Sequence, residues 1–374
     1  MPDIPTPQAV RQAAARFAPQ EKILGIHRND AGHINDTYAL TLAAPAGRII
    51  LQRVNTTVFT QPVQLMENMV RITDFLRRRL AEAGGDPDRE TLRPLPDADG
   101  GYLYWDADGA PWRAFPYIEG TVTHQRVTDA AQLYEAGCAF GRFQCLLDGF
   151  PAGVLHEVIP RFHDTARRCR ALQDAEAADP IGRAASVRRE LAFAGERFAS
   201  AGLLQTLLDT GELPLRVTHN DTKINNVLMD KDTGHAVCVI DLDIVMPGSL
   251  LFDFGDAIRS GVNTADEDER DLDRVRMDAD CYRAFTQGFL RHIAGHLTPR
   301  ERALLPVAAR LMTYECGVRF LTDHINGDTY FHISRPGHNL DRARTQFHLL
   351  AQLETHETAL TDMLEEILHQ AAAE

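Results

Sequence analysis

The first 118 residues alternate apolar and polar positions in a pattern that predicts mostly antiparallel sheet. A short helix is expected first, over about 7–17, where apolar residues recur at helical spacing. Strand-like runs bounded by turn residues follow at 22–28, 35–42, 47–54, 101–106 and 111–118. Between them, an amphipathic helix is expected from Pro62 to about Ala83, where two glycines end it.

From about residue 128 the apolar spacing becomes helical. Helices are expected at 129–148, 162–175, 186–208, 271–295, 299–326 and 340–370, with short strands only within 213–245. A chain of 374 residues usually forms more than one core, so we expect two domains, 1–117 and 118–374. The predicted class is α+β, with a small antiparallel β-rich N-terminal part and a larger, mostly helical C-terminal part.

Composition narrows the range of partners. The net charge of -14 disfavours nucleic acid as a partner, because the chain and the phosphate backbone repel one another. An anionic nucleotide is still compatible with this charge, because local basic groups and Mg²⁺ can dominate one site. No run of about 18 apolar residues occurs, so no membrane contact is expected.

The six cysteines are dispersed and form no zinc-ligand spacing, which favours free thiols in a reducing compartment. The N-terminus lacks a basic segment followed by an apolar run, so no signal peptide is expected. These features together predict a soluble, cytoplasmic protein. The oligomeric state has no signature in the sequence.

The segment 217–243 carries the most informative polar residues. His219 and Asp221 follow a short strand, and Asn226 comes five residues after Asp221. The apolar runs on either side of the turn 231–234 should pair as a hairpin, which brings Asn226 and Asp241 to the same open end.

Two carboxylates and an amide oxygen are the groups that phosphoryl transfer needs. One carboxylate, Asp221, would orient the attacking hydroxyl and accept its proton, while Asn226 and Asp241 would be hard oxygen ligands for Mg²⁺. His219 would brace the loop. The alternative is a turn without function, since Asn and Asp often bond their own backbone; the following strand and Asp241 at the right separation favour the catalytic interpretation.

The segment resembles the Brenner motif of aminoglycoside-phosphotransferase-like kinases, and the chain as a whole is most similar to N-acetylhexosamine 1-kinases. The similarity rests on GHINDTY (32–38), ILQRVN (50–55), MEN (66–68), FHDT (162–165), HNDTKINNVL (219–228), DLDIVMPG (241–248), DFGD (253–256) and RFLTDHINGDTYF (319–331). The resemblance implies a two-lobed protein-kinase-like fold, the cofactors ATP and Mg²⁺, and a small-molecule acceptor.

The kinase template implies a cation on the strand 47–54 and a carboxylate on the helix after it. Arg53 stands where kinases usually have Lys, and Glu67 would orient it through an ion pair. Gln52 is the rival for contact with the phosphates. The alternative is an exposed strand arginine and a solvated glutamate.

Other nucleotide contacts follow from the same template. The turn containing Gly32 and His33 would cover the phosphates, with His33 as either an acceptor contact or a surface turn residue. Backbone groups near Tyr117 and Ile118 would bond the adenine. Asp253 and Asp256 resemble a kinase Asp-Phe-Gly motif, but the metal-binding Asp should end the second hairpin strand, so we expect both to brace the catalytic loop.

The acceptor pocket should lie in the helical part. Its candidates are Arg319, Asp323, Tyr330 and His332, with Arg319 and Tyr330 favoured as contacts for a polar ring bearing an acetamido arm. A surface ion pair is the alternative for Arg319. His324, His332 and His338 match no standard metal-ligand spacing.

The favoured activity is transfer of phosphate from ATP to the anomeric hydroxyl of N-acetylglucosamine or N-acetylgalactosamine. The runner-up is a kinase of the same fold acting on an amino alcohol or aminoglycoside, which the acidic composition would suit. A nucleotide-binding regulator without catalysis is a third hypothesis, against which the presence of Asp221, Asn226 and Asp241 argues.

Overall fold

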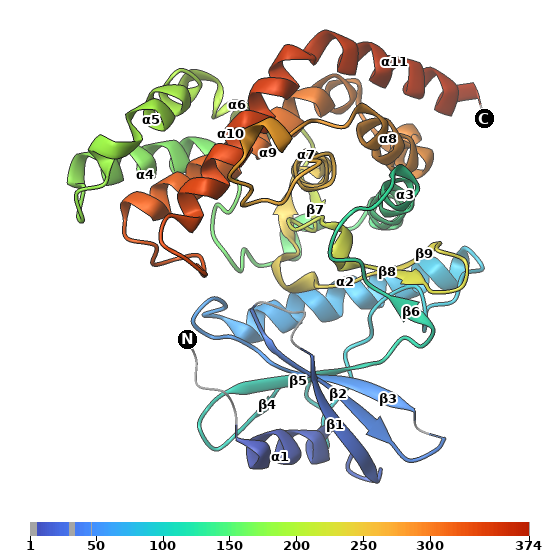
Figure 1. The fold of residues 1–374 in the computed structure, drawn as a ribbon. Helices are drawn as coiled ribbons and strands as arrows, with labels where there is room; N and C mark the ends of the chain where they lie inside the picture. Colours follow the sequence, from blue (N-terminus) through green and yellow to red (C-terminus); the bar gives the residue numbers. More distant parts are fainter. Residues whose placement is uncertain (1–5, 30–33, 46, 374) are drawn as a thin grey trace. The chain divides into compact units, whose positions relative to one another are not determined.

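The computed structural model describes residues 6–29, 34–45 and 47–373, and the chain divides into two compact units (Figure 1). The first unit contains Met1–Val122, Gly149–Pro160 and Leu228–Met246, and the second contains Thr123–Asp148, Arg161–Val227 and Pro247–Glu374. Neither unit is continuous along the chain. The predicted boundary between 117 and 118 lies near the end of the first of these segments.

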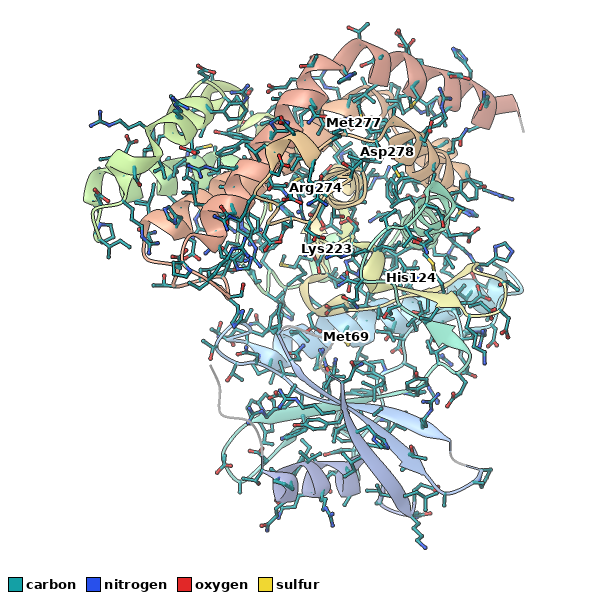
Figure 2. The ribbon with its side chains drawn as sticks, in the orientation of Figure 1. Met69, His124, Lys223, Arg274, Met277 and Asp278 are labelled. Atoms are coloured by element: carbon teal, nitrogen blue, oxygen red, sulfur yellow. The ribbon has the colours of Figure 1, made fainter. Side chains whose placement is uncertain are left out.

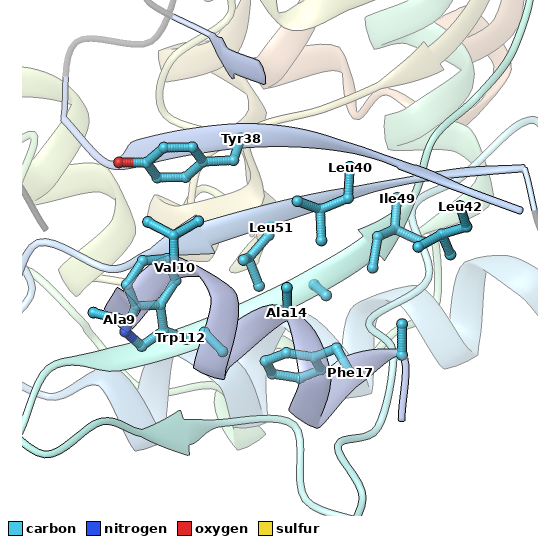
Figure 3. Close-up of a cluster of buried hydrophobic side chains, with 13 residues drawn as sticks. Ala9, Val10, Ala14, Phe17, Tyr38, Leu40, Leu42, Ile49, Leu51 and Trp112 are labelled. Carbon is cyan, nitrogen blue, oxygen red and sulfur yellow. The ribbon is translucent and has the colours of Figure 1, made fainter. Parts of the chain in front are cut away.

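A five-stranded antiparallel sheet forms the centre of the first unit. Its strands, in spatial order, are β1 (Ile23–Asn29), β2 (Asp36–Leu42), β3 (Arg48–Arg53), β5 (Pro111–Pro116) and β4 (Tyr104–Trp105). Helix α1 (Pro7–Phe17) packs its apolar side onto one face, where it meets the side chains shown in Figure 3. Leu40 and Leu51 are fully buried there, and such burial contributes roughly 1.5–3 kcal/mol for each side chain.

The other face of this sheet is on the side of helix α2 (Pro62–Glu82) (Figure 1). The helix starts with Pro62, whose missing N–H has no helical partner to lose at that position. A second sheet has the order β6 (Thr121–Val122), β8 (Val227–Asp230) and β9 (Ala236–Val239). The predicted hairpin over 227–239 is therefore present as β8 and β9.

The second unit is almost entirely helical. Its helices are α3 (Ala130–Leu146), α4 (Thr165–Ala178), α5 (Arg188–Gly195), α6 (Leu203–Asp209), α7 (Leu250–Gly261), α8 (Ala279–Ile293), α9 (Pro299–Ile325), α10 (His338–Thr355) and α11 (Glu357–Ala373). Short strands β7 (Arg216–Thr218) and β10 (Met246–Gly248) pair beside them. Helices α3 and α8 approach closely because glycines meet backbone at the crossing: a Cβ on Gly141 would lie 2.2 Å from the Phe289 carbonyl oxygen.

The α+β class is confirmed, and three of the predicted helices are wrong in extent. The expected helix 186–208 is divided into α5 and α6, with Gly195 and Gly202 at the break. The expected helix 340–370 is divided between α10 and α11. The expected helix 271–295 starts only at α8, because Asp278 caps it by accepting a hydrogen bond from the Cys281 amide. Within the described residues, every helix is too short or too polar to cross a membrane.

Candidate active site

Two buried carboxylates of helix α7 hold the loop that contains Asp221. Asp253 accepts hydrogen bonds from the amides of His219, at 2.9 Å, and Asn220, at 2.8 Å. Asp256 accepts one from the Thr222 amide at 2.9 Å. Three backbone amides within four residues of the loop are thus tied to one helix.

The carboxylates are themselves fixed in place. Asp253 lies in the first turn of α7, where the helix dipole favours negative charge, and it accepts a further hydrogen bond from Gln144 at 2.6 Å. Burial raises the pKa of Asp253, against the lowering effect of His219 and the loop amides. Asp256 accepts from both Nε and Nη2 of Arg259, so its buried charge is paired. The Asp-Phe-Gly-Asp run therefore lies inside a helix and does not end a strand.

His219 is fully buried beneath this loop. Its ring packs edge-on against Phe140 and Phe143, with centroids 5.5 and 5.9 Å away. Its Nδ1 accepts a hydrogen bond from the Asp221 amide at 3.3 Å. A buried ring that packs against two phenylalanines and is bonded to the loop backbone suits bracing better than proton transfer.

Asp221 is an ionised carboxylate with three polar contacts. Lys223 Nζ lies 2.9 Å from Oδ1, and Asn226 Nδ2 donates to both Oδ2 and the backbone oxygen at 2.8 Å. Burial would raise the pKa of Asp221, but Lys223, helped by His219 and Asn226, lowers it to about 2. Lys223 (labelled in Figure 2) was not among the residues predicted from the sequence. Its position two residues after Asp221 was the available signal.

Asn226 of this loop and Asp241 of the first unit each carry an oxygen donor of the kind that suits Mg²⁺. Because Nδ2 of Asn226 points to Asp221, its Oδ1 is left without a hydrogen bond among the described residues and can act as a hard oxygen ligand. Asp241, two residues after β9, offers a carboxylate from a left-handed backbone, with φ 61° and ψ 58°. Backbone strain of this kind, worth roughly 1–3 kcal/mol, clusters at functional positions. Mg²⁺ commonly takes only one or two protein ligands and completes its shell with phosphate and water.

The expected ion pair between Arg53 and Glu67 is wrong. Arg53 pairs with Asp36, the residue directly opposite on β2, at 2.9 Å. Glu67 contacts His156 at 2.7 Å and Arg71 at 3.5 Å. The strand alternation explains this difference: Arg53 follows Leu51, which faces α1, whereas the helix carrying Glu67 lies across the other face of the sheet.

Gln52 lies on the α2 side of the sheet and is bonded to Arg113. Arg113 forms a buried ion pair with Asp243 that was not predicted from the sequence. The Oε1 of Gln52 accepts from Nε and Nη2 of Arg113, at 3.0 and 2.8 Å. Arg113 Nη1 lies 2.6 Å from Asp243, and both side chains are almost fully buried. An arginine inside the apolar run 111–118 was the only available signal.

The segment expected to bind adenine has part of its backbone already bonded. The Tyr117 amide donates to Arg48 O at 3.0 Å, and the Ile118 carbonyl accepts from Thr121 at 2.7 Å. In the described part of the chain, the Tyr117 carbonyl and the Ile118 amide are left as one acceptor and one donor. Gly32 and His33 lie outside the described residues.

Arg319 and Tyr330 lie at the end of α9 and in the loop after it. The Arg319 guanidinium lies over the rings of Phe162 and Phe331, 5.0 and 5.4 Å from their centroids, and makes no hydrogen bond or ion pair with the described residues. Tyr330 is 65% exposed and packs edge-on against Phe331. Both side chains therefore keep their donors available to a ligand.

Asp323, considered above as an acceptor contact, is bonded to its own loop. Its oxygens accept from the amides of Thr329, Tyr330 and Phe331 at 2.8–2.9 Å, and from Asn339 Nδ2 at 2.9 Å. The carboxylate is buried and shapes the loop that carries Tyr330.

A second arginine beside Arg319 was missed from the sequence. Burial lowers the pKa of Arg168, and the neighbouring charge of Arg319 lowers it further. One buried carboxylate compensates: Glu315 accepts from Thr165 at 2.6 Å and lies 2.8 Å from His163. Although burial opposes ionisation, His163 and Arg319 lower the pKa of Glu315.

The antiparallel sheet, the helical unit and a braced loop with an ionised aspartate define a phosphotransferase of kinase-like fold. Residues 25–292 match the model of the phosphotransferase enzyme family (APH), and the chain belongs to this family.

Solved structures share the fold at low identity. An aminopropanol kinase associated with a microcompartment is 17% identical with a TM-score of 0.57, covering 95% of this chain and 98% of that one. The GDP complex of aminoglycoside 2'-phosphotransferase-IIIa is 12% identical with a TM-score of 0.62, covering 92% and 99%. A choline kinase from Cryptosporidium parvum Iowa II is 12% identical with a TM-score of 0.51, covering 90% and 91%.

Proposed function

We propose that the protein transfers the γ-phosphate of ATP to the anomeric hydroxyl of an N-acetylhexosamine, yielding a sugar 1-phosphate. The observation that supports phosphoryl transfer is the state of Asp221: its carboxylate is ionised, is held by Lys223 and Asn226, and stands on a loop braced by α7. The sequence resemblance to N-acetylhexosamine 1-kinases supports the choice of an N-acetylhexosamine as the acceptor. One solved relative of the same fold is described as an ADP complex, which supports nucleotide use.

Asp221 orients the acceptor hydroxyl through a hydrogen bond to its carboxylate. With a pKa of about 2 it is a weak base, so it takes the proton only as the new oxygen–phosphorus bond forms. A loose transition state suits this order, because the hydroxyl needs positioning more than early deprotonation. His219, Asp253 and Asp256 keep the loop in place.

Asn226 and Asp241 would be the ligands of Mg²⁺, which would neutralise charge on the nucleotide phosphates. Arg53, oriented by Asp36 in place of Glu67, and the turn with Gly32 contact the phosphates, with Gln52 as the alternative contact. The Tyr117 carbonyl and the Ile118 amide bond the adenine edge.

Arg319 and Tyr330, together with His33, contact the sugar. The charge around Arg319 supports a neutral acceptor over an amino alcohol or aminoglycoside. Arg168 and Arg319 place two guanidinium groups near one another against one buried carboxylate, Glu315, and a cationic acceptor would add a third positive charge. Amine acceptors remain the second candidate, because relatives of the same fold include an aminopropanol kinase and a choline kinase.

The test is an acceptor panel with ATP and Mg²⁺. It contains N-acetylglucosamine, N-acetylgalactosamine, glucosamine, choline, aminopropanol and an aminoglycoside. We expect turnover of the acetylated sugars, a much poorer reaction with glucosamine, and a 1-phosphate by phosphorus NMR. A 6-phosphate, or turnover of the amines alone, would overturn the acceptor assignment and leave the kinase assignment standing. No turnover of any acceptor would count against the kinase itself.

A further inference from the structure

A guanidinium is buried in the middle of the first unit, on a strand whose pattern is otherwise apolar. Arg113 is 2% exposed and stands directly opposite Gln52 in the register of β3 and β5. Two of its nitrogens donate to Gln52, and the third lies 2.6 Å from Asp243. With its nitrogens engaged and its side chain buried, Arg113 does not reach a bound ligand from this position.

The carboxylate that Arg113 holds belongs to the segment directly after Asp241. Asp243 sits in the single helical turn Leu242–Ile244 and also accepts a hydrogen bond from Asn35 at 2.6 Å. One residue beyond this turn, the Val245 carbonyl accepts from Asn68 of α2 at 3.2 Å. Residues before β2, on β5 and on α2 therefore fasten this segment.

Asp241 itself adopts a left-handed backbone immediately before that turn. This conformation costs energy for a residue other than glycine, although less for aspartate than for most, and the fastened turn after it helps to hold it. Asp243 lies two residues after Asp241 and is held by Arg113 and by Asn35.

Stability alone does not account for a charged pair at this place. Replacing a buried ion pair with apolar residues of similar size is often neutral or stabilising, whereas removing one partner is strongly destabilising. A fixed cation is useful where a carboxylate and its neighbours must keep one orientation.

We propose that Arg113 is a positioning residue that sets the direction of the Asp241 carboxylate by anchoring Asp243. Kinases build a cation–carboxylate pair from a strand and the following helix; in this chain a buried pair joins a cation on β5 to a carboxylate in the segment after Asp241. The inference rests on the proposed role of Asp241 as a Mg²⁺ ligand.

The test measures binding of ADP by calorimetry, with and without Mg²⁺, together with thermal unfolding. The variants are Arg113→Met, Arg113→Lys, and the double variant Arg113→Met with Asp243→Asn. Arg16→Met, an arginine of α1 that pairs with Asp97 and Asp99, is the matched control in the same unit.

Arg113→Met should lower both the melting temperature and the Mg²⁺-dependent affinity for ADP, and Arg113→Lys should recover part of each. The double variant removes both charges and should regain most of the thermal stability. Its Mg²⁺-dependent affinity should stay about 10–100-fold below wild type, the usual loss when a residue supporting a metal ligand is changed. The Arg16→Met control should bind like wild type.

Two results would overturn the inference. The first leaves the proposed role of Asp241 as a Mg²⁺ ligand intact, and the second overturns that role as well. If the double variant regains both stability and Mg²⁺-dependent binding, the pair is structural only, and the role of Asp241 is untouched. Asp241→Ala is measured in parallel and is expected to abolish the Mg²⁺ dependence, with Asn226→Ala weakening it. If Asp241→Ala binds ADP with unchanged Mg²⁺ dependence, Asp241 is not the ligand, and both the proposed metal site and this inference fail.

Discussion

The loop proposed for catalysis, residues 218–226 (the catalytic loop), and the loop proposed to contact the acceptor, residues 326–333 (the acceptor loop), are held in the same way in the second unit. In the first loop Asp253 accepts hydrogen bonds from two successive backbone amides and Asp256 from one more, and in the second loop Asp323 accepts from three successive amides. The carboxylates of the catalytic loop come from a helix more than thirty residues later in the chain. Asp323 lies only six to eight residues before the amides that it holds.

The loops differ in what they leave exposed. His219, Asn220 and Thr222 are buried, whereas Asp221, Lys223 and Asn225 are partly exposed. The acceptor loop instead exposes Tyr330. A loop fixed from a distant helix suits unchanging chemistry, whereas a locally held, exposed loop can vary with the acceptor.

The largest effect is expected at Asp221. Asp221→Asn keeps the shape but removes the charge that orients the acceptor, and we expect kcat to fall roughly 10²–10⁴-fold. Nucleotide affinity, measured by calorimetry, should stay near wild type because the change lies at the acceptor side. Turnover within a few-fold of wild type would show that Asp221 is not the base. The contrast between a catalytic loop and an acceptor loop would then fail.

Arg319→Ala should act on the acceptor alone. Loss of a charged hydrogen bond costs about 1.5–3 kcal/mol, so the sugar kcat/KM should fall by about 10–150-fold with little change in KM for ATP. Arg300→Ala, an exposed change at the other end of α9, is the control. Equal losses for sugar and ATP would show that Arg319 serves the fold and not the acceptor.

Asp323→Asn should loosen the acceptor loop without disturbing the catalytic loop. The amide replaces an oxygen that accepts from backbone and Asn339, and losing about 1 kcal/mol there corresponds to about a fivefold rise in the sugar KM. KM for ATP and kcat should change less. An Asp362→Asn change on α11 is the control, and an unchanged sugar KM would mean that Tyr330 does not depend on this carboxylate.

The smallest effect on activity at neutral pH is expected from Lys223→Met, because Asp221 should still be ionised there. Lys223 lowers the pKa of Asp221, so without it the pKa should rise towards the ordinary aspartate value. The acidic limb of the kcat/KM profile should therefore move to higher pH, because Asp221 must be ionised to orient the acceptor. Between pH 4 and 8 the wild-type profile should show no fall at its acidic end, because a pKa of about 2 lies below this range, whereas the profile of the variant should begin to fall near pH 4. An equally flat profile for the variant would mean that Asp221 is ionised without help from Lys223.

The sequence specified the elements that depend on near neighbours. Alternation predicted the strands of the five-stranded sheet, although β4 is shorter than expected, and a hydrophobic stripe predicted α2 and α9. The catalytic segment was also readable, because Asp221 and Asn226 lie in one loop and their contact spans five residues. The breaks between α5 and α6 and between α10 and α11 were not foreseen, since apolar spacing continues across them.

The tertiary structure decided which charges meet. Arg53 pairs with Asp36 and not with Glu67, and Arg113 finds a carboxylate 130 positions later in the chain, at Asp243. Residue type alone made Asp323 a candidate acceptor contact, yet in the fold it accepts hydrogen bonds from the amides of its own loop. Local periodicity determines which residues of a helix or strand lie on the same face. A buried charge instead pairs with whichever opposite charge packing brings within about 3 Å, and that pairing depends on contacts between elements far apart in the sequence.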